Sequence, residues 1–169
     1  MAQNIEAKVR EMTLNLHVTG DNQKAVATCI MHTGSGLERV ETTVEIGMHQ
    51  AALKALINML SGHVKAKNME IGLTTSSCYL IKMLGDGEFR RMTPVERLAK
   101  LGAKEVQLWN TLAKVLKFNG NTLKMTGELD TEELERAKYT ALWKLHAIQE
   151  AEAAANIASS EEELEVAEA

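Results

Sequence analysis

The sequence predicts a single α/β domain in which three antiparallel strands are followed by alternating helices and strands. Three observations indicate this class. Apolar and polar residues alternate with a period of two through residues 12–19, which is typical of a strand, and residues 37–46 are rich in the strand-forming residues Val and Thr. From residue 48 the apolar spacing becomes helical, and two later segments, at 69–75 and 122–126, return to a strand-like pattern. A chain of 169 residues, 45% of them hydrophobic, is long enough to bury one core.

The first three elements are expected to form an antiparallel meander. Residues 12–19 alternate apolar and polar side chains, and residues 24–31 and 37–46 form the next two strands. Turn-forming residues at 20–23 and 33–36 separate them. Consecutive strands joined by such short turns pair in antiparallel fashion.

The later elements alternate between helix and strand. Because a helix separates the fourth strand from the meander, this strand can join the sheet in parallel. Thr93-Pro-Val-Glu96 is a capping box with proline at the first helical position, so a short helix starts there. The other expected elements are a helix at 48–61, a strand at 69–75, a helix from Ser76 or Ser77 to 84, a helix at 104–118, a strand at 122–126 and a long helix from 130 or 131.

The chain is expected to consist of one domain, residues 1–157, and an acidic, disordered tail, residues 158–169. The last eleven residues carry five glutamates and no base, and without them the net charge changes from −4 to +1. This balance is not that of a dedicated, strongly basic nucleic-acid-binding protein. No apolar run approaches the ~18 residues of a membrane span. The N-terminus lacks the apolar segment of a secretory signal, so a cytoplasmic location without a membrane partner is expected.

Four segments resemble type 1 ribonuclease H (RNase H). Residues 68–84 are similar to the fourth strand and second helix of that family, and residues 106–112 to its Val-x-Leu-Trp helix. Residues 123–127 and 132–141 are similar to its fifth strand and last helix. The resemblance covers residues 12–150. It implies an RNase H-like, five-stranded mixed sheet, made of three antiparallel strands and two parallel additions, with helices on both faces.

The resemblance also implies that the catalytic site is missing. In an active type 1 RNase H, four carboxylates hold two divalent metal ions, which carry out hydrolysis. The matching positions hold Thr19, His49, Ser76 and Lys138, and the family's loop histidine corresponds to Glu128. A lysine in a metal site repels Mg²⁺. The chain is therefore expected to be a degenerate copy, a pseudoenzyme with no catalytic residues, no metal and no cofactor.

The family's basic protrusion, which grips RNA–DNA hybrids, corresponds to a segment that is rich in bases here. Three glutamates lie between these bases, so a solvated helical surface is the alternative interpretation. Lys65 and Lys67 are open to the same two interpretations. Residues 44–47 replace the family's Asn-rich entry to the first helix, which weakens hybrid recognition. The residues expected to contact nucleic acid are Arg90, Arg91, Arg97, Lys100, Lys104 and Lys138.

Two functions follow as the main hypotheses. The first is a catalytically inactive RNase H-like protein that binds a duplex or an RNA–DNA hybrid without cleaving it. The second is a protein-interaction or regulatory module built on the same scaffold, of the kind expected in a phage, with a protein partner instead of nucleic acid. An enzyme with a relocated site is a third class. Trp109 and Trp143 are both expected in the core, and Cys29 and Cys78 are expected as buried, reduced thiols.

Overall fold

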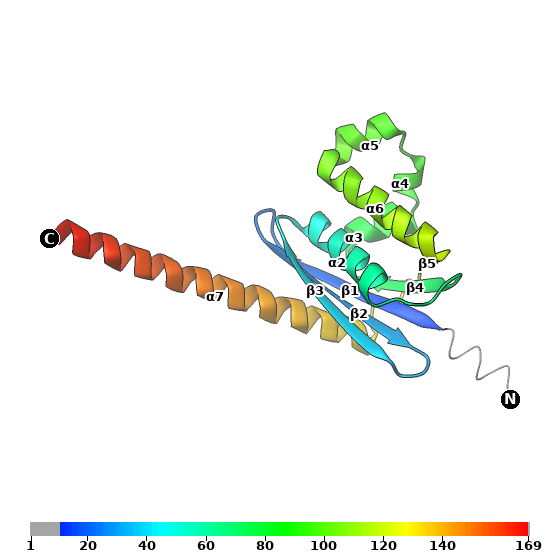
Figure 1. The fold of residues 1–169 in the computed structure, drawn as a ribbon, viewed down its shortest axis with the longest axis horizontal. Helices are drawn as coiled ribbons and strands as arrows, with labels where there is room; N and C mark the ends of the chain where they lie inside the picture. Colours follow the sequence, from blue (N-terminus) through cyan, green and yellow to red (C-terminus); the bar gives the residue numbers. More distant parts are fainter. Residues whose placement is uncertain (1–10, 169) are drawn as a thin grey trace.

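The computed structural model describes residues 11–168, and the side chains of residues 11–163. It has one five-stranded sheet in the order β3-β2-β1-β4-β5 (Figure 1). Strand β1 pairs antiparallel with β2 and parallel with β4, β2 pairs antiparallel with β3, and β4 pairs parallel with β5. This mixed sheet confirms the predicted fold class. The strands are β1 (Met12–Gly20), β2 (Ala25–Thr33), β3 (Glu38–Glu45), β4 (Glu70–Thr75) and β5 (Thr122–Met125).

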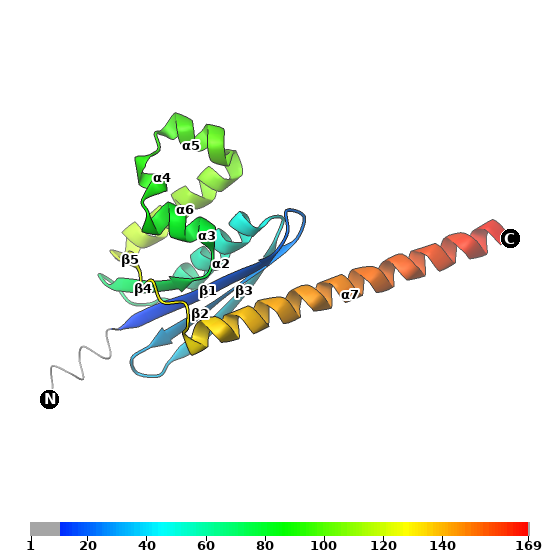
Figure 2. The ribbon, with the colours of Figure 1, turned by 180° about the vertical axis from the view of Figure 1, so that it is seen from behind.

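Helices cover both faces of the sheet (Figures 1 and 2). Helix α2 packs on one face, against β1, β2 and β3, and α6 packs on α2. Helix α7 crosses the opposite face, against β1 and β2. The helices are α2 (Met48–Gly62), α3 (Cys78–Leu80), a π-helical turn η1 (Ile81–Gly85), α4 (Glu88–Arg91), α5 (Pro94–Leu101), α6 (Ala103–Asn119) and α7 (Glu132–Glu168).

Strand β1 divides its side chains between these two faces. Leu14, Leu16 and Val18 are buried in the large core that includes α2. Because side chains alternate along a strand, Asn15 and His17 point to the face that α7 covers. The core on that face is small, with Val26, Ala141 and Leu145 at its centre. The period of two seen in the sequence thus separates an apolar face from a polar one.

Capping side chains set the helix starts as the sequence indicates. The Thr93 hydroxyl accepts a hydrogen bond from the Glu96 amide at 3.2 Å, and Pro94 occupies the first helical position of α5. The Ser77 hydroxyl accepts from the Leu80 amide at 3.3 Å and starts α3 directly after β4. The short strand-to-helix connection holds the end of β4 in a fixed position.

Three sequence-based expectations differ from the structure. Trp143 is 74% exposed and not in the core, and Cys78 is exposed while Cys29 is buried. Helix α7 continues to Glu168, where a disordered tail was expected from residue 158. Residues 151–168 contain no glycine or proline and consist mainly of alanine and glutamate, which have high helix propensity. Among the described residues, none of the helices has the length and apolar character needed to cross a membrane.

Candidate functional site

The parallel pairing of β1 with β4 brings His17 beside Ser76. Leu16 is the register partner of Thr75, so the next residues along both strands are neighbours. The His17 Nδ1 lies 2.5 Å from the Ser76 Oγ. The Thr75 hydroxyl donates to the Leu16 carbonyl at 2.8 Å and accepts from the Ser77 amide at 3.1 Å. These bonds fix the chain where β4 ends.

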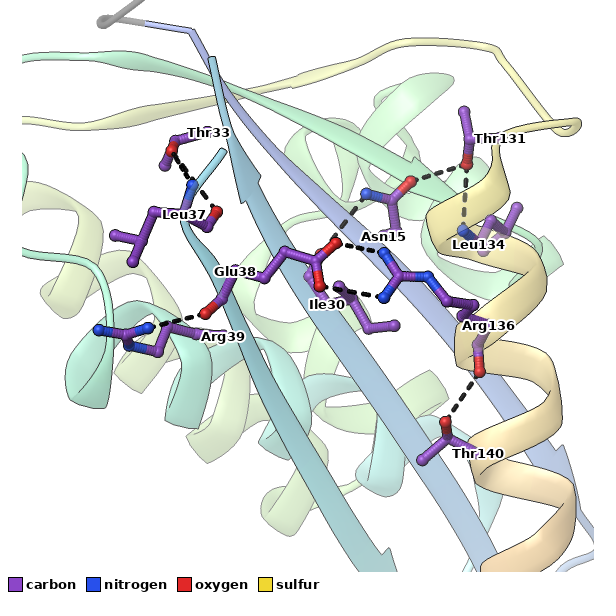
Figure 3. A network of polar contacts seen from close by, with 10 residues as sticks. All are labelled: Asn15, Ile30, Thr33, Leu37, Glu38, Arg39, Thr131, Leu134, Arg136 and Thr140. Carbon is purple, nitrogen blue, oxygen red and sulfur yellow. Dashed lines mark hydrogen bonds and ion pairs between the residues drawn. The ribbon is translucent and has the colours of Figure 1, made fainter. Parts of the chain in front are cut away.

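Helix α7 places Lys138 near His17 and the end of β4. Its start is anchored by Thr131, which accepts from the Leu134 amide at 3.1 Å and donates to the Asn15 side-chain oxygen at 2.8 Å. One turn further, the Arg136 guanidinium forms a two-pronged ion pair with Glu38, the first residue of β3 (Figure 3). These contacts set the position of the first turns of α7. Lys138 consequently lies close enough to His17 to affect its pKa.

We call His17, Ser76, Glu135 and Lys138 the β1–β4 corner. Burial lowers the pKa of His17, the Lys138 ammonium lowers it further, and the Glu135 carboxylate opposes both. The imidazole is therefore held in its neutral form at neutral pH. The only carboxylate of the corner is already engaged, because the Glu135 Oε2 lies 3.5 Å from the Lys138 Nζ.

This corner does not fit a pair of divalent metal ions. Hard cations such as Mg²⁺ take oxygen ligands, and two-metal sites are built mainly from carboxylates. The corner offers one carboxylate beside an ammonium group, a hydroxyl and an imidazole. In the part of the chain that the structure describes, no group of three or more His, Cys, Asp or Glu side chains is placed to hold a metal ion.

The fold has several counterparts among solved structures. RNase H1 from the halophilic archaeon Halobacterium salinarum NRC-1 matches with a TM-score of 0.56 and 15% identity, covering 81% of this chain and 98% of that one. LC9-RNase H1, a type 1 RNase H with the type 2 active-site motif, matches with a TM-score of 0.51 and 17% identity, covering 79% and 71%. The N-terminal RNase H domain of rv2228c from Mycobacterium tuberculosis, solved as a maltose-binding-protein fusion, gives 0.50 and 12%, covering 78% and 98%.

The chain has an RNase H-like fold. At these identities the similarity shows the fold alone. No protein-family model matches the sequence, and no curated protein matches it. The function of this RNase H-like chain must therefore be argued from its own side chains.

The four positions matched to the family's carboxylates do not all meet in space. Ser76 and Lys138 belong to the β1–β4 corner, but the β1 residue beside Ser76 is His17, and Thr19 lies two residues further along the strand. His49 stacks on Tyr79 with ring centroids 3.7 Å apart, and its Nδ1 lies 3.3 Å from the Glu105 carboxylate. The His49 ring thus contacts α3, through Tyr79, and α6, through Glu105.

Glu128, the counterpart of the family's loop histidine, lies on an exposed connection between β5 and α7. Its amide donates to the Thr126 hydroxyl at 3.3 Å. Within residues 11–163, its carboxylate forms no hydrogen bond or ion pair with the β1–β4 corner.

Three of the six bases expected to contact nucleic acid have partners within the protein: Lys138, which pairs with Glu135 as described above, and also Arg97 and Lys104. The Arg97 guanidinium lies 4.0 Å from the centre of the Phe89 ring, and its Nε donates to the Phe89 carbonyl at 3.1 Å. The Lys104 Nζ lies 3.9 Å from the Glu45 Oε2. Within residues 11–163, by contrast, the three exposed bases on α4 and α5 make no ion pair: Arg90, Arg91 and Lys100.

A second basic surface lies in a groove between the C-terminal ends of α2 and α6, here named the α2–α6 groove. Phe118 projects at its edge with 85% of its surface exposed. Sequence analysis noted Lys65 and Lys67 but not Lys114 or Phe118, which come from a helix about 50 residues away. The groove is lined by Ser61, Val64, Lys65, Lys67, Lys114, Val115, Phe118 and Asn119.

Proposed function

We propose that this chain is a catalytically inactive RNase H-like protein that binds nucleic acid, a duplex or an RNA–DNA hybrid, without cleaving it. The observation that carries the proposal is the β1–β4 corner, where the resemblance expects a metal pair and the chain has Lys138 beside His17 and Ser76. An ammonium group attracts a phosphate but cannot replace two metal ions in hydrolysis.

The distribution of charge supports binding despite the net charge of −4. Seven glutamates and no base lie in residues 149–168, on the part of α7 that projects beyond the sheet (Figure 1). The bases of α4, α5 and the α2–α6 groove lie on the opposite side of the sheet from α7 (Figure 2). Phosphates can therefore approach these bases without passing the acidic part of the helix. Lys138 lies on the α7 side of the sheet, in the first two turns of that helix and before its acidic part, so it forms a separate contact point.

The α2–α6 groove adds a feature suited to unpaired bases. Lys65, Lys67 and Lys114 make no ion pair with any described side chain, and they line the same groove as the exposed ring of Phe118. Cationic grooves that present an aromatic ring bind single strands, because the cations follow the phosphates and a base stacks on the ring.

A salt titration tests the proposal. Fluorescence anisotropy of a labelled RNA–DNA hybrid, duplex DNA and single-stranded RNA is measured between 50 and 200 mM salt. If Arg90, Arg91, Lys100 and Lys138 each contact one phosphate, the slope of log K against log salt is about −3.6, and affinity falls roughly 100-fold over that range. Absence of saturable binding to all three probes at 50 mM salt overturns the proposal.

A matched pair of variants assigns the corner. Lys138→Met removes the corner ammonium and should make the slope shallower by about 1. Lys144→Met removes the same charge from an exposed position of α7 that is six residues away and should leave the slope unchanged. Equal slopes for both variants would remove the corner from the binding surface.

A protein-interaction or regulatory module is the second candidate. It is favoured by large apolar side chains on the outer face of α7, where Tyr139, Leu142 and Trp143 are each more than half exposed. Failure to bind all three nucleic-acid probes, together with intact folding, would favour this candidate.

A further inference from the structure

Helix α7 has a second apolar face, which points away from the sheet. Its inner face buries Leu134, Ala137, Ala141 and Leu145. On its outer face Tyr139 is 59%, Leu142 54%, Trp143 74% and Ile157 61% exposed. Single exposed apolar residues are ordinary, but four large ones on one side of a helix form a surface suited to a partner.

Three of these outer residues, Tyr139, Trp143 and Ile157, follow the spacing of a helix–helix seam, and Leu142 lies beside it. Steps of four and three residues alternate along the helix from position 139, which is the seven-residue repeat of paired helices. The seam positions are Tyr139, Trp143, His146, Glu150, Ala153, Ile157 and Ser160. The sequence therefore provides about three heptads of a narrow stripe on the face opposite the core, apolar towards its two ends and polar at His146 and Glu150 in its middle.

We propose that this stripe binds α7 of a second copy of the chain, antiparallel and two-fold symmetric about residue 148. Each heptad has two seam positions, and in an antiparallel pair the first seam position of one helix faces the second seam position of the partner helix. The register centred on residue 148 pairs the seam positions in this way along the whole stripe. It places Tyr139 against the partner's Ile157 and Trp143 against the partner's Ala153. A large residue meets a smaller one in both layers, as close packing requires.

The charges favour the antiparallel arrangement. In this register His146 faces the partner's Glu150, twice in the symmetric dimer. A parallel pair would instead set Glu150 against Glu150 and bring together two helix halves that each carry seven glutamates and no base. The antiparallel pair places each acidic half beside the neutral half of the partner helix, which contains all the bases of α7: Arg136, Lys138 and Lys144.

The architecture leaves room for the second copy. The sheet lies on the inner side of α7, and the helix extends past it (Figures 1 and 2). The partner's sheet would lie on the far side of the helix pair, away from the first sheet. The overlap, residues 136–160, is about 37 Å long at 1.5 Å per residue.

The projecting part of α7 points to the same occupant. Lys24 forms an ion pair with Glu152, and no described side chain beyond Glu152 bonds to another element. The part of α7 beyond Glu152, residues 153–168, is a short helix whose described side chains form no bond to another element. Such a helix is only marginally stable in water, so a second helix packed against it would stabilise it. This inference does not depend on nucleic-acid binding.

Sedimentation velocity of the full chain at 1–100 μM tests the proposal. The expected result is a concentration-dependent species of twice the 18.6 kDa chain mass. Ile157→Glu should raise the dimer dissociation constant more than tenfold, because it places a charge in the seam. Ala155→Glu is the matched control: it adds the same charge two residues away, off the seam, and should leave the dimer intact. Circular dichroism verifies that both variants are folded.

A charge exchange tests the antiparallel register. His146→Glu should weaken the dimer, and adding Glu150→Lys should restore it. Within one helix the His146 Nδ1 already lies 3.6 Å from the Glu150 Oε1, but between two helices these positions face each other only in the antiparallel pair, whereas a parallel pair would set each against its own copy. A wild-type chain that remains monomeric at 100 μM overturns the proposal. A dimer that Ile157→Glu and Ala155→Glu weaken equally also overturns the proposal. If the double variant His146→Glu/Glu150→Lys does not regain the dimer, the antiparallel register is wrong.

Discussion

Trp109 joins α6 to the segment between β4 and α5, and its replacement by alanine should cost about 3–5 kcal/mol of unfolding free energy. The side chain is 3% exposed and stacks on Phe89 with ring centroids 4.6 Å apart. Its Nε1 donates to the Tyr79 hydroxyl at 2.8 Å, and that hydroxyl donates to Glu105. The variant leaves a cavity, removes an aromatic contact and deprives the Tyr79 hydroxyl of a donor, so the cost should lie in the upper part of this range.

Trp143 provides an internal control for the same substitution. It also lies in a helix but is 74% exposed, so Trp143→Ala should change the stability of the monomer by no more than about 0.5 kcal/mol. Both variants exchange tryptophan for alanine in a helix, so helix propensity largely cancels in the comparison. The difference between them reports burial. The comparison belongs at a protein concentration where sedimentation shows a monomer, because dimerisation adds to apparent stability.

Urea unfolding followed by circular dichroism at 222 nm measures both costs. With a slope of about 2 kcal/mol per M, Trp109→Ala should lower the midpoint by roughly 1.5–2.5 M and Trp143→Ala by less than about 0.3 M. Equal midpoint shifts, or a larger shift for Trp143→Ala, would refute the packing described for α6 and α7.

Two further predictions concern thiol reactivity and pH. A thiol reagent should label Cys78 in a fast phase and Cys29 only on unfolding, because burial raises the pKa of Cys29 and excludes the reagent. The Cys78→Ser variant should lack the fast phase of labelling. A fast phase that survives in this variant would contradict the exposures of the two thiols. Arg136→Met should lower the free energy of unfolding at neutral pH. The difference in unfolding free energy between the variant and the parent should vanish as the pH falls through the folded-state pKa of Glu38. Arg136 holds that pKa below its unfolded value, so the stabilisation is present above the unfolded pKa and is lost on protonation. A difference that does not change with pH would show that the ion pair is not its cause.

The sequence predicted the parts of the fold that local patterns determine. The alternation in β1 and the capping box at Thr93 each depend on a few neighbouring residues. The buried face of α7 was harder to predict, because this helix carries two apolar stripes at helical spacing. Leu142 and Trp143 lie on one and Leu145 on the other, and only the sheet decides which stripe is buried. The same ambiguity made Trp143 look like a core residue.

The candidate site was predicted in part. Ser76 and Lys138 follow from the resemblance, but His17 depends on the parallel register of β1 and β4. His17 and Thr19 lie on the same face of the strand, so periodicity cannot distinguish them. The α2–α6 groove brings Lys65 and Phe118 together through the packing of two helices, which no local pattern records.

We propose that this RNase H-like chain binds nucleic acid without cutting it. The most direct test of this proposal is one sample containing the chain, an end-labelled RNA–DNA hybrid and Mg²⁺ or Mn²⁺, analysed on native and denaturing gels. The account predicts a retarded complex whose two strands remain full-length after prolonged incubation. Metal-dependent shortening of either strand, or a hybrid that is never retarded, would contradict it.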